Sequence, residues 1–219
     1  MTYRWITFDC YGTLIDWHTG IREALARVTP SLRPEQIESL ARDYERVEHA
    51  LEAETWQPYR TILQTALITL FRNHGLVSPQ PADILVQALP TWKPFQEVSA
   101  VLTALKDAGH SLAILSNVDR DLIQGSLAQL PVEFDLVVTA EDVGSYKPAP
   151  AHWERFLLMT AAEPKEVLHV AAGLHYDIPT AQRLGFRACW INRRGENSNG
   201  IQPDAMAPNL TGVFDELLR

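Results

Sequence analysis

The feature that most constrains the fold is a strict alternation of short apolar runs and amphipathic segments after Pro94. Each apolar run has the length of a strand and follows a segment with helical spacing of apolar residues. The predicted helices cover residues 98–109, 119–130, 149–162 and 178–185, and the predicted strands cover 111–116, 134–140, 166–172 and 186–191. Short loops between alternating strands and helices indicate a parallel sheet with helices on both faces.

A further strand is predicted at Trp5 to Phe8, and a long helical stretch separates it from the others. Segments such as GIREALARV and YRTILQTALITLFRNHG carry apolar residues three and four positions apart. We therefore expect a doubly wound α/β core, residues 1–15 and 93–219, with a helical cap, residues 16–92, inserted after the first strand. The polar stretch 193–208, rich in Gly and Pro, is expected to be a surface loop.

The charge balance limits the kinds of partner. The 219 residues include 27 Asp and Glu against 19 Lys and Arg, a formal net charge of −8, so a basic face for nucleic acid is not expected. The two cysteines, Cys10 and Cys189, match no disulfide or metal spacing and are interpreted as buried thiols. We see no export leader and no apolar run of about 18 residues, and therefore expect a cytoplasmic protein without a membrane partner.

Polar residues follow four of the predicted strands, at the points where each strand ends. In an open parallel sheet, ligands bind beyond the carboxyl ends of the strands. The residues at these ends are, in chain order, Asp9, Ser116, Asn117, Lys147, His175 and Asp177. An acid, a hydroxyl, an amide, a lysine and a second acid on successive strands together indicate a catalytic site.

The stretches FDCYGTLID, ILSNVD, SYKPAP and HVAAGLHYDIPTA resemble the four ordered motifs of the haloacid dehalogenase (HAD) superfamily. The resemblance covers the whole predicted core, and the inserted helices match the family's cap. The form DxYGTL is similar to the 2-haloacid dehalogenase branch, and TAEDVGSYKPAP and LHVAAGLHYDI are closer to a subgroup that includes azetidine-2-carboxylate hydrolase. The resemblance implies a Rossmann-like core, and because members of this branch are often dimers, a homodimer.

The resemblance implies that Asp9 is a nucleophile that forms a covalent ester with the substrate. The ammonium group of Lys147 is expected to keep that carboxylate ionised. Thr13 and Ser116 are expected to donate hydrogen bonds to Asp9 or to a substrate carboxylate. Capping of the following turn is the simpler alternative for Asp9.

The second acid, Asp177, is predicted to position the water that cleaves the ester. Capping of the helix that starts near Ile178 is the alternative. His175 is a second candidate for handling the proton of that water. Asn117 resembles the family's amide that helps to cradle the leaving halide.

The residue two positions after Asp9 separates two chemistries. Phosphatases of the superfamily carry a second Asp there, which protonates the leaving alkoxide, whereas this chain has Tyr11. A tyrosine hydroxyl, with an ordinary pKa of about 10, is a poor acid at neutral pH. A halide leaves without a proton because its conjugate acid is strong, so Tyr11 fits carbon–halogen cleavage as a wall of the substrate pocket.

The fourth motif favours the same chemistry. Ala172 stands where the family's phosphatases carry an acid that binds Mg²⁺. We therefore expect no metal and no other cofactor, although Asp177 remains as a single oxygen ligand.

The predicted cap departs from the dehalogenase pattern. Well-studied members use a cap arginine to bind the departing halide, and Arg42 and Arg46 lie near that position in sequence. Pairing with acidic neighbours on a solvated helix is the simpler explanation for each. Trp56, Tyr59 and Trp92 are candidates to line the pocket, although core packing explains bulky aromatics equally well.

The sequence as a whole predicts a metal-independent hydrolase that acts on C2 of a small 2-substituted carboxylic acid, similar to the (S)-2-haloacid dehalogenases. Tyr11, Asn117, Arg42, Arg46 and His175 are the candidate substrate-binding residues. Three alternatives stay open: ring opening at a C–N bond, as in azetidine-2-carboxylate hydrolase, a Mg²⁺-dependent phosphatase, and a non-catalytic HAD-like binding protein.

Overall fold

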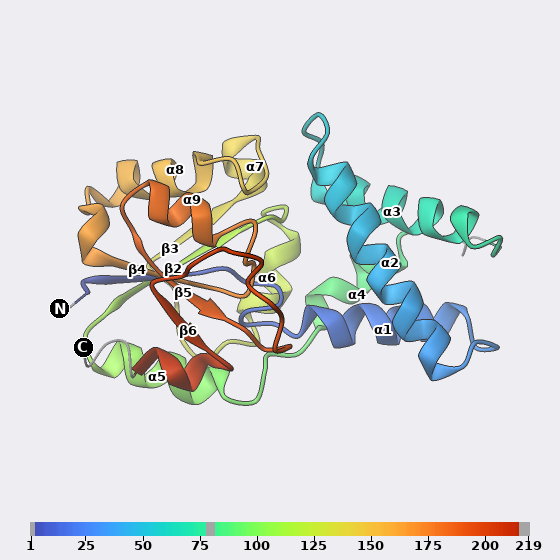
Figure 1. Cartoon of the computed structure of the whole chain (residues 1–219), viewed down its shortest axis with the longest axis horizontal. Coiled ribbons are helices and arrows are strands. Elements are labelled where there is room, and N and C mark those ends of the chain that lie inside the picture. The colour runs from blue at the N-terminus through green and yellow to red at the C-terminus, as the bar shows by residue number, and fades with distance from the viewer. Residues whose placement is uncertain (1–2, 78–81, 215–219) are drawn as a thin grey trace.

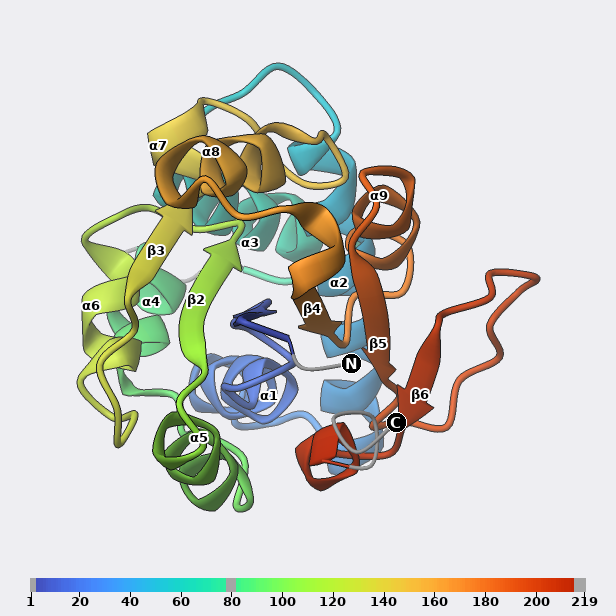
Figure 2. The ribbon, with the colours of Figure 1, turned by 90° about the vertical axis from the view of Figure 1, so that its left-hand side faces the viewer.

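The computed structural model of the chain describes residues 3–77 and 82–214. Within these residues, six parallel strands form one sheet in the order β3-β2-β1-β4-β5-β6 (Figure 1, Figure 2). The strands are β1 (Trp5–Phe8), β2 (Ser111–Ser116), β3 (Leu136–Thr139), β4 (Val167–Ala171), β5 (Arg187–Ile191) and β6 (Ala205–Ala207). The predicted doubly wound parallel sheet is confirmed. The strand order reverses between β1 and β4, which is where such sheets open a crevice for ligands.

Helices cover both faces of the sheet (Figure 1). On one face lies α5 (Val98–Asp107), and on the other lie α8 (Ala151–Thr160) and α9 (Ile178–Arg183). Alternate residues of β1 point to opposite faces, so Ile6 packs in the cluster that contains α5 and Trp5 packs in the cluster that contains α8. The sheet is therefore buried on both sides, which explains its apolar strands.

A further set of helical segments is short. They are α6 (Leu122–Leu127), the four-residue α7 (Ala140–Val143) and three short 3₁₀ segments, Leu89–Thr91, Pro164–Glu166 and Leu210–Gly212. None of the helices in the described ranges is long and apolar enough to cross a bilayer.

Four further helices, which we call the cap helices, lie together beside the sheet (Figure 1). They are α1 (Trp17–Val28), α2 (Pro34–Glu52), α3 (Tyr59–Asn73) and α4 (Ile84–Ala88). The helix α2 packs against both α1 and α3. Residues 78–81 of the predicted cap lie outside the described residues, and the division into domains at residues 15/16 and 92/93 stays a prediction.

Two neighbouring linkers connect the core to the cap helices. The backbone N–H of Asp16 donates to the carbonyl of Lys93 at 2.8 Å, and that of Phe95 donates to the carbonyl of Leu14 at 3.0 Å. The first linker starts with a tight turn at Gly12, whose φ of +86° favours glycine over any residue with a Cβ. The chain thus leaves the core and returns to it at the same place.

The structure corrects one expectation about a loop. The stretch 193–208 is irregular over most of its length, but Ala205–Ala207 forms the edge strand β6 and pairs with Cys189–Ile191. This strand has three residues and is flanked by turn-forming residues, so it gave no period-two pattern to detect.

Candidate active site

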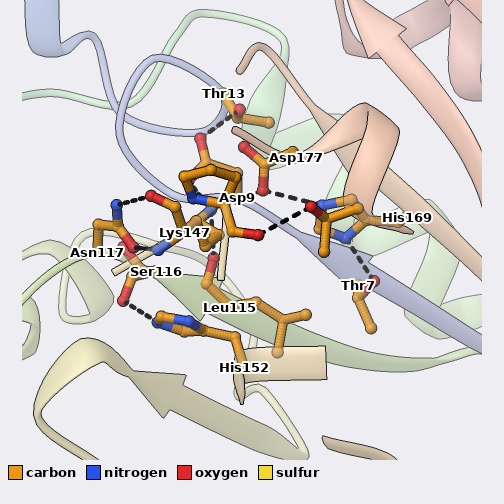
Figure 3. A network of polar contacts seen from close by, with 12 residues as sticks. Thr7, Asp9, Thr13, Leu115, Ser116, Asn117, Lys147, His152, His169 and Asp177 are labelled. Carbon is orange, nitrogen blue, oxygen red and sulfur yellow. Dashed lines mark hydrogen bonds and ion pairs between the residues drawn. The ribbon is translucent and has the colours of Figure 1, made fainter. Parts of the chain in front are cut away.

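Asp9 directly follows β1 and places a carboxylate at the centre of a polar network (Figure 3). Its Oδ2 accepts a hydrogen bond of 2.8 Å from Thr13 Oγ1, and its Oδ1 accepts one of 2.9 Å from Lys147 Nζ. Thr13 Oγ1 itself accepts from the N–H of Ala172 at 2.8 Å, so the Thr13 proton is directed to Asp9. Asp9 is 8 % exposed, and its carboxylate is held by these side chains instead of capping the turn.

Lys147 joins the two acids of the site. Its Nζ donates to Asp9 Oδ1 at 2.9 Å, to Asp177 Oδ1 at 2.7 Å and to the Leu115 carbonyl at 3.0 Å (Figure 3). All three donors of the ammonium group are therefore used. Burial on its own would lower the pKa of Lys147, but the carboxylates of Asp177 and Asp9 outweigh it and raise the pKa above its ordinary value. Lys147 is thus a fixed positive charge at neutral pH.

Asp177 stands just before α9, yet its side chain makes no capping hydrogen bond to that helix. Its Oδ1 lies 2.7 Å from Lys147 Nζ and 3.1 Å from His169 Nε2. A Cβ at Gly173 would lie 2.3 Å from Asp177 Oδ2, so only glycine leaves room for the carboxylate in this position. The geometry disfavours the alternative in which Asp177 serves only to cap the helix.

His169 is a member of the network that the sequence prediction missed. It is fully buried in β4, and its Nδ1 lies 2.8 Å from Thr7 Oγ1 in the neighbouring strand β1 (Figure 3). Thr7 and His169 are register partners, so the two strands place them side by side. The available signal was a polar residue within each of two largely apolar predicted strands, Thr7 in the first and His169 in the other.

The surroundings shift the pKa values of the two acids in opposite directions. Burial raises the pKa of Asp9 above its ordinary value, although Lys147 opposes this shift. Burial would also raise the pKa of Asp177, but Lys147 and His169 outweigh it and lower that pKa. Two neighbouring carboxyl groups with divergent pKa values are typical of sites in which the two acids have different tasks.

A cavity of about 400 Å³ lies at the carboxyl edge of the sheet, beside the cap helices. The predicted residues that line it are Asp9, Tyr11, Ser116, Asn117, Lys147 and Asp177. Thr13 is fully buried next to Asp9. The Oγ of Ser116, which is 1 % exposed, has no hydrogen-bond partner in the described part of the chain.

The structure places three predicted substrate-binding residues away from the cavity. Arg42, Arg46 and His175 are exposed and do not line it, so their assignment to substrate binding is corrected. Arg46 pairs with Asp43 on the outside of α2. In place of His175 its neighbour Tyr176 faces the cavity.

The inward face of α2 carries acids instead of arginines. Glu45, Glu48, His49 and Glu52 line the cavity and follow the i, i+3, i+4, i+7 spacing of one helix face. Glu48 Oε1 accepts a hydrogen bond of 2.5 Å from Tyr59 Oη. Sequence reasoning missed these acids because charged residues on a helix are expected to face solvent.

Glu52 reaches the core through Asn117. The Nδ2 of Asn117 lies 3.3 Å from Glu52 Oε2 and 3.3 Å from the carbonyl of Lys147. Its Oδ1 accepts a hydrogen bond of 2.8 Å from the N–H of Lys147. Asn117 therefore fixes the loop that carries Lys147 and presents its amide to a cap helix.

Of the aromatic candidates, two line the cavity, Trp92 is buried in the core and Trp56 is exposed. Tyr11 and Tyr59 line the cavity, whereas Trp56 and Trp92 do not. Tyr11 Oη lies 3.0 Å from Ser126 Oγ, and burial raises the pKa of Tyr11 well above its ordinary value. Trp92 meets the Tyr11 ring edge-on at 6.2 Å. Tyr11 thus lines the cavity, and its hydroxyl is a weaker acid than that of an ordinary tyrosine.

The residues at the cavity do not form an evident metal site. In the described ranges, no group of three or more His, Cys, Asp or Glu side chains is arranged to hold a metal ion. The Oδ1 atoms of Asp9 and Asp177 both accept from Lys147, and Ala172 offers no side-chain ligand. The expected independence from metal stays a prediction.

The fold and the site together define a hydrolase built on a Rossmann-like parallel sheet, with its polar residues at the carboxyl edge. The chain belongs to the haloacid dehalogenase-like hydrolase family, whose model matches residues 3–185.

Characterised relatives and solved structures agree with this membership. The (S)-2-haloacid dehalogenase of Pseudomonas sp. (strain YL) is 30 % identical over 218 residues, which cover 96 % of this chain and 92 % of the relative. The L-2-haloacid dehalogenase RSc1362 superimposes with a TM-score of 0.88 at 21 % identity over 100 % of both chains. The L-2-haloacid dehalogenase of Xanthobacter autotrophicus with chloropropionic acid covalently bound gives a TM-score of 0.83 at 21 % identity over 97 % of both chains.

Proposed function

We propose that this protein hydrolyses a small 2-substituted carboxylic acid at C2 through an ester on Asp9. A carboxylate oxygen of Asp9 forms a bond to C2, and the C2 substituent leaves with the bonding electron pair. Water then adds to the Asp9 carbonyl carbon, and the ester bond breaks to release a 2-hydroxy acid. The observation that supports this proposal is the buried Asp9 carboxylate, oriented by Thr13 and Lys147 at the wall of a cavity.

The other acid suits the second step. Both Lys147 and His169 contact Oδ1 of Asp177, which leaves Oδ2 as the oxygen that can accept a proton from water. Its lowered pKa keeps Asp177 ionised, so it can orient the water that attacks the ester. The unpartnered Oγ of Ser116 is suited to bind the carboxylate of the substrate.

The phosphatase alternative has weaker support. A phosphate ester needs a proton for its leaving alkoxide, and Tyr11, whose hydroxyl is bonded to Ser126, does not supply one. Without an acid at Ala172, the repulsion between Asp9 and a phosphate group is also poorly offset.

Single turnover in ¹⁸O-labelled water tests the covalent route. With excess enzyme and (S)-2-chloropropionate, we expect unlabelled lactate of inverted configuration and one ¹⁸O atom in the Asp9 peptide. Label in the first product with none in Asp9 would exclude the ester. Chloride release should persist in the presence of a chelator and be lost in Asp9→Asn. Chelator-sensitive cleavage of an aryl phosphate, without chloride release, would favour the phosphatase.

A further inference from the structure

The cavity is lined by polar residues of the core and by acidic residues of a cap helix. Ser116 and Lys147 line it from the core, and Glu48 and Glu52 line it from α2. These two acids stand one helical turn apart on α2, on the face that lines the cavity. A substrate in the cavity therefore meets the Ser116 hydroxyl on the core side and carboxyl groups on the side of α2.

The positive charges around the cavity are already paired with carboxylates. Arg194 lies 3.2 Å from Glu45, and Arg193 lies 2.8 Å from Glu97 while its guanidinium stacks over Phe95. Lys147 is bound to Asp9 and Asp177. Among the described residues that line the cavity, each Lys and Arg is thus paired, and none pairs with Glu48 or Glu52.

The two acids on the side of α2 have neutral hydrogen-bond donors only. Glu48 receives the hydroxyl of Tyr59 at 2.5 Å, and Glu52 receives the amide of Asn117 at 3.3 Å. Burying a carboxylate without a counter-charge is costly. Burial accordingly raises the pKa of Glu48 to about 8, and burial together with Glu48 raises that of Glu52 well above its ordinary value. Both groups can release a proton when a positive charge arrives.

A halide is a poor ligand for this side of the cavity. The amide that was expected to cradle it, on Asn117, is directed at Glu52 Oε2. An anion at that amide would lie next to a carboxyl group and gain no cation from the cap, because Arg42 and Arg46 are on the outside of α2.

We propose that Glu48 and Glu52 form a subsite for a positively charged nitrogen of the substrate, so that the preferred 2-substituted acid carries an ammonium group on its side chain. The substrate is then a small zwitterion with its carboxylate toward Ser116 and its ammonium toward α2. The hydroxyl of Tyr59 holds one oxygen of Glu48 and leaves the other for the ligand. This proposal rests on the proposed function for the reacting carbon, but the subsite itself can be tested without turnover.

A pair of isosteric substrates isolates the ammonium group. In 3-amino-2-chloropropanoate an ammonium replaces the terminal methyl of 2-chlorobutanoate, and both compounds release chloride. We expect kcat/KM to be roughly ten- to hundredfold higher for the amino compound, the range of a charge-assisted hydrogen bond, after subtraction of uncatalysed release. The preference should fall at least about tenfold in Glu52→Gln and in Glu48→Gln. Glu54→Gln, which removes an exposed acid outside the cavity, is the matched control and should retain it.

Binding of unreactive analogues separates this proposal from the proposed function. We expect calorimetry to show tighter binding of 3-aminopropanoate than of butanoate to the wild-type chain, with the difference lost in Glu52→Gln. This result would uphold the subsite even if neither chloro acid were hydrolysed. Equal or absent binding of the two analogues would overturn the subsite. Hydrolysis without preference for the amino compound would overturn it as well. In either case the proposed reaction would still stand if chloride is released.

Discussion

At the scale of single residues, Lys147 links the two acids of the site. It is 3 % exposed, and its three donors bind Asp9, Asp177 and the Leu115 carbonyl. This geometry sets the distance between the two carboxylates and offsets their mutual repulsion. Removal of the ammonium group would leave two buried acids without a counter-charge, which costs more than the loss of an exposed ion pair.

Lys147→Met tests this role. We expect kcat to fall roughly 10²- to 10³-fold or more, as for loss of a fixed electrostatic group. We also expect the free energy of unfolding at neutral pH to fall by about 3–5 kcal/mol, because the partner charges stay buried. Chloride release and urea unfolding measure the two effects. Lys165→Met is the control, because Lys165 is an exposed residue paired only with Glu163; equal effects of the two changes would contradict the role of Lys147.

Glu48 makes the stability of the protein depend on pH. Its pKa is raised from 4.5 to about 8 by burial, so between these values the folded chain binds a proton that the unfolded chain has lost. The stabilisation from this protonated group is complete below the unfolded pKa and is lost as the pH rises through about 8. Glu48→Gln should therefore gain stability relative to wild type on going from pH 5 to pH 9, as measured by urea unfolding at each pH. A constant difference between the two proteins would show that Glu48 does not titrate in this way.

The position of each residue in the chain explains why some residues of the site could be predicted and others could not. Asp9, Ser116, Lys147 and Asp177 stand at strand ends, which the apolar runs locate, and the structure brings them together at one cavity. Glu52 sits on a long helix with acids on several sides, and only the packing of α2 shows which of them face inward. The same packing turns Arg42 and Arg46 outward.

At the scale of elements, a residue from the core provides the N-terminal capping group of α3, one of the cap helices. The helix α3 begins after Pro58, which provides no side-chain cap. Instead the carboxylate of Asp119, in the loop after β2, accepts the N–H of Tyr59 at 2.7 Å and the N–H of Arg60 at 3.0 Å. A negative charge at the positive end of a helix is stabilising, and here it also holds α3 against the core.

Asp119→Asn tests this contact. We expect the free energy of unfolding to fall by roughly 0.5–2 kcal/mol, the range for a lost helix cap. Asp121→Asn is the control, because its pair with Arg60 is exposed and worth about 0–1 kcal/mol. Urea unfolding of both variants gives the comparison, and an Asp121 effect as large as that of Asp119 would refute a special role for the buried acid.

The elements that were not predicted are too short to show a hydrophobic pattern in the sequence. The four-residue helix α7 begins with a capping box between Thr139 and Asp142, within a stretch that was assigned to a strand and a loop. The edge strand β6 depends on its pairing with β5. Both elements owe their form to neighbouring backbone or to local caps, and neither is long enough to show a hydrophobic period.

At the scale of the whole molecule, one hydrophobic cluster runs through both the sheet and the cap helices. It contains Ile6 and Val101 from the core together with Leu25, Leu40 and Leu67 from the cap helices. A shared core of this kind couples the stability of the two parts.

We therefore expect cooperative unfolding in a single transition. Far-UV circular dichroism and tryptophan fluorescence should give coincident urea curves, and the calorimetric and van't Hoff enthalpies should agree. Trp17, in α1, reports on the cap helices, and Trp153 and Trp190, in α8 and β5, report on the core. Two separate transitions would show that the cap helices fold as an independent unit.

The two hydrogen-bonded linkers bear on how the length of the inserted segment can vary in evolution. Asp16 and Lys93 are joined by a backbone hydrogen bond of 2.8 Å, so the ends of the inserted segment are already neighbours. The entropy of closing a loop on fixed ends grows only slowly with its length. An insertion of almost any size can therefore occupy this position without moving the sheet. The inserted helices can thus vary while the acids at the strand ends, Asp9 and Asp177, keep their positions on the sheet.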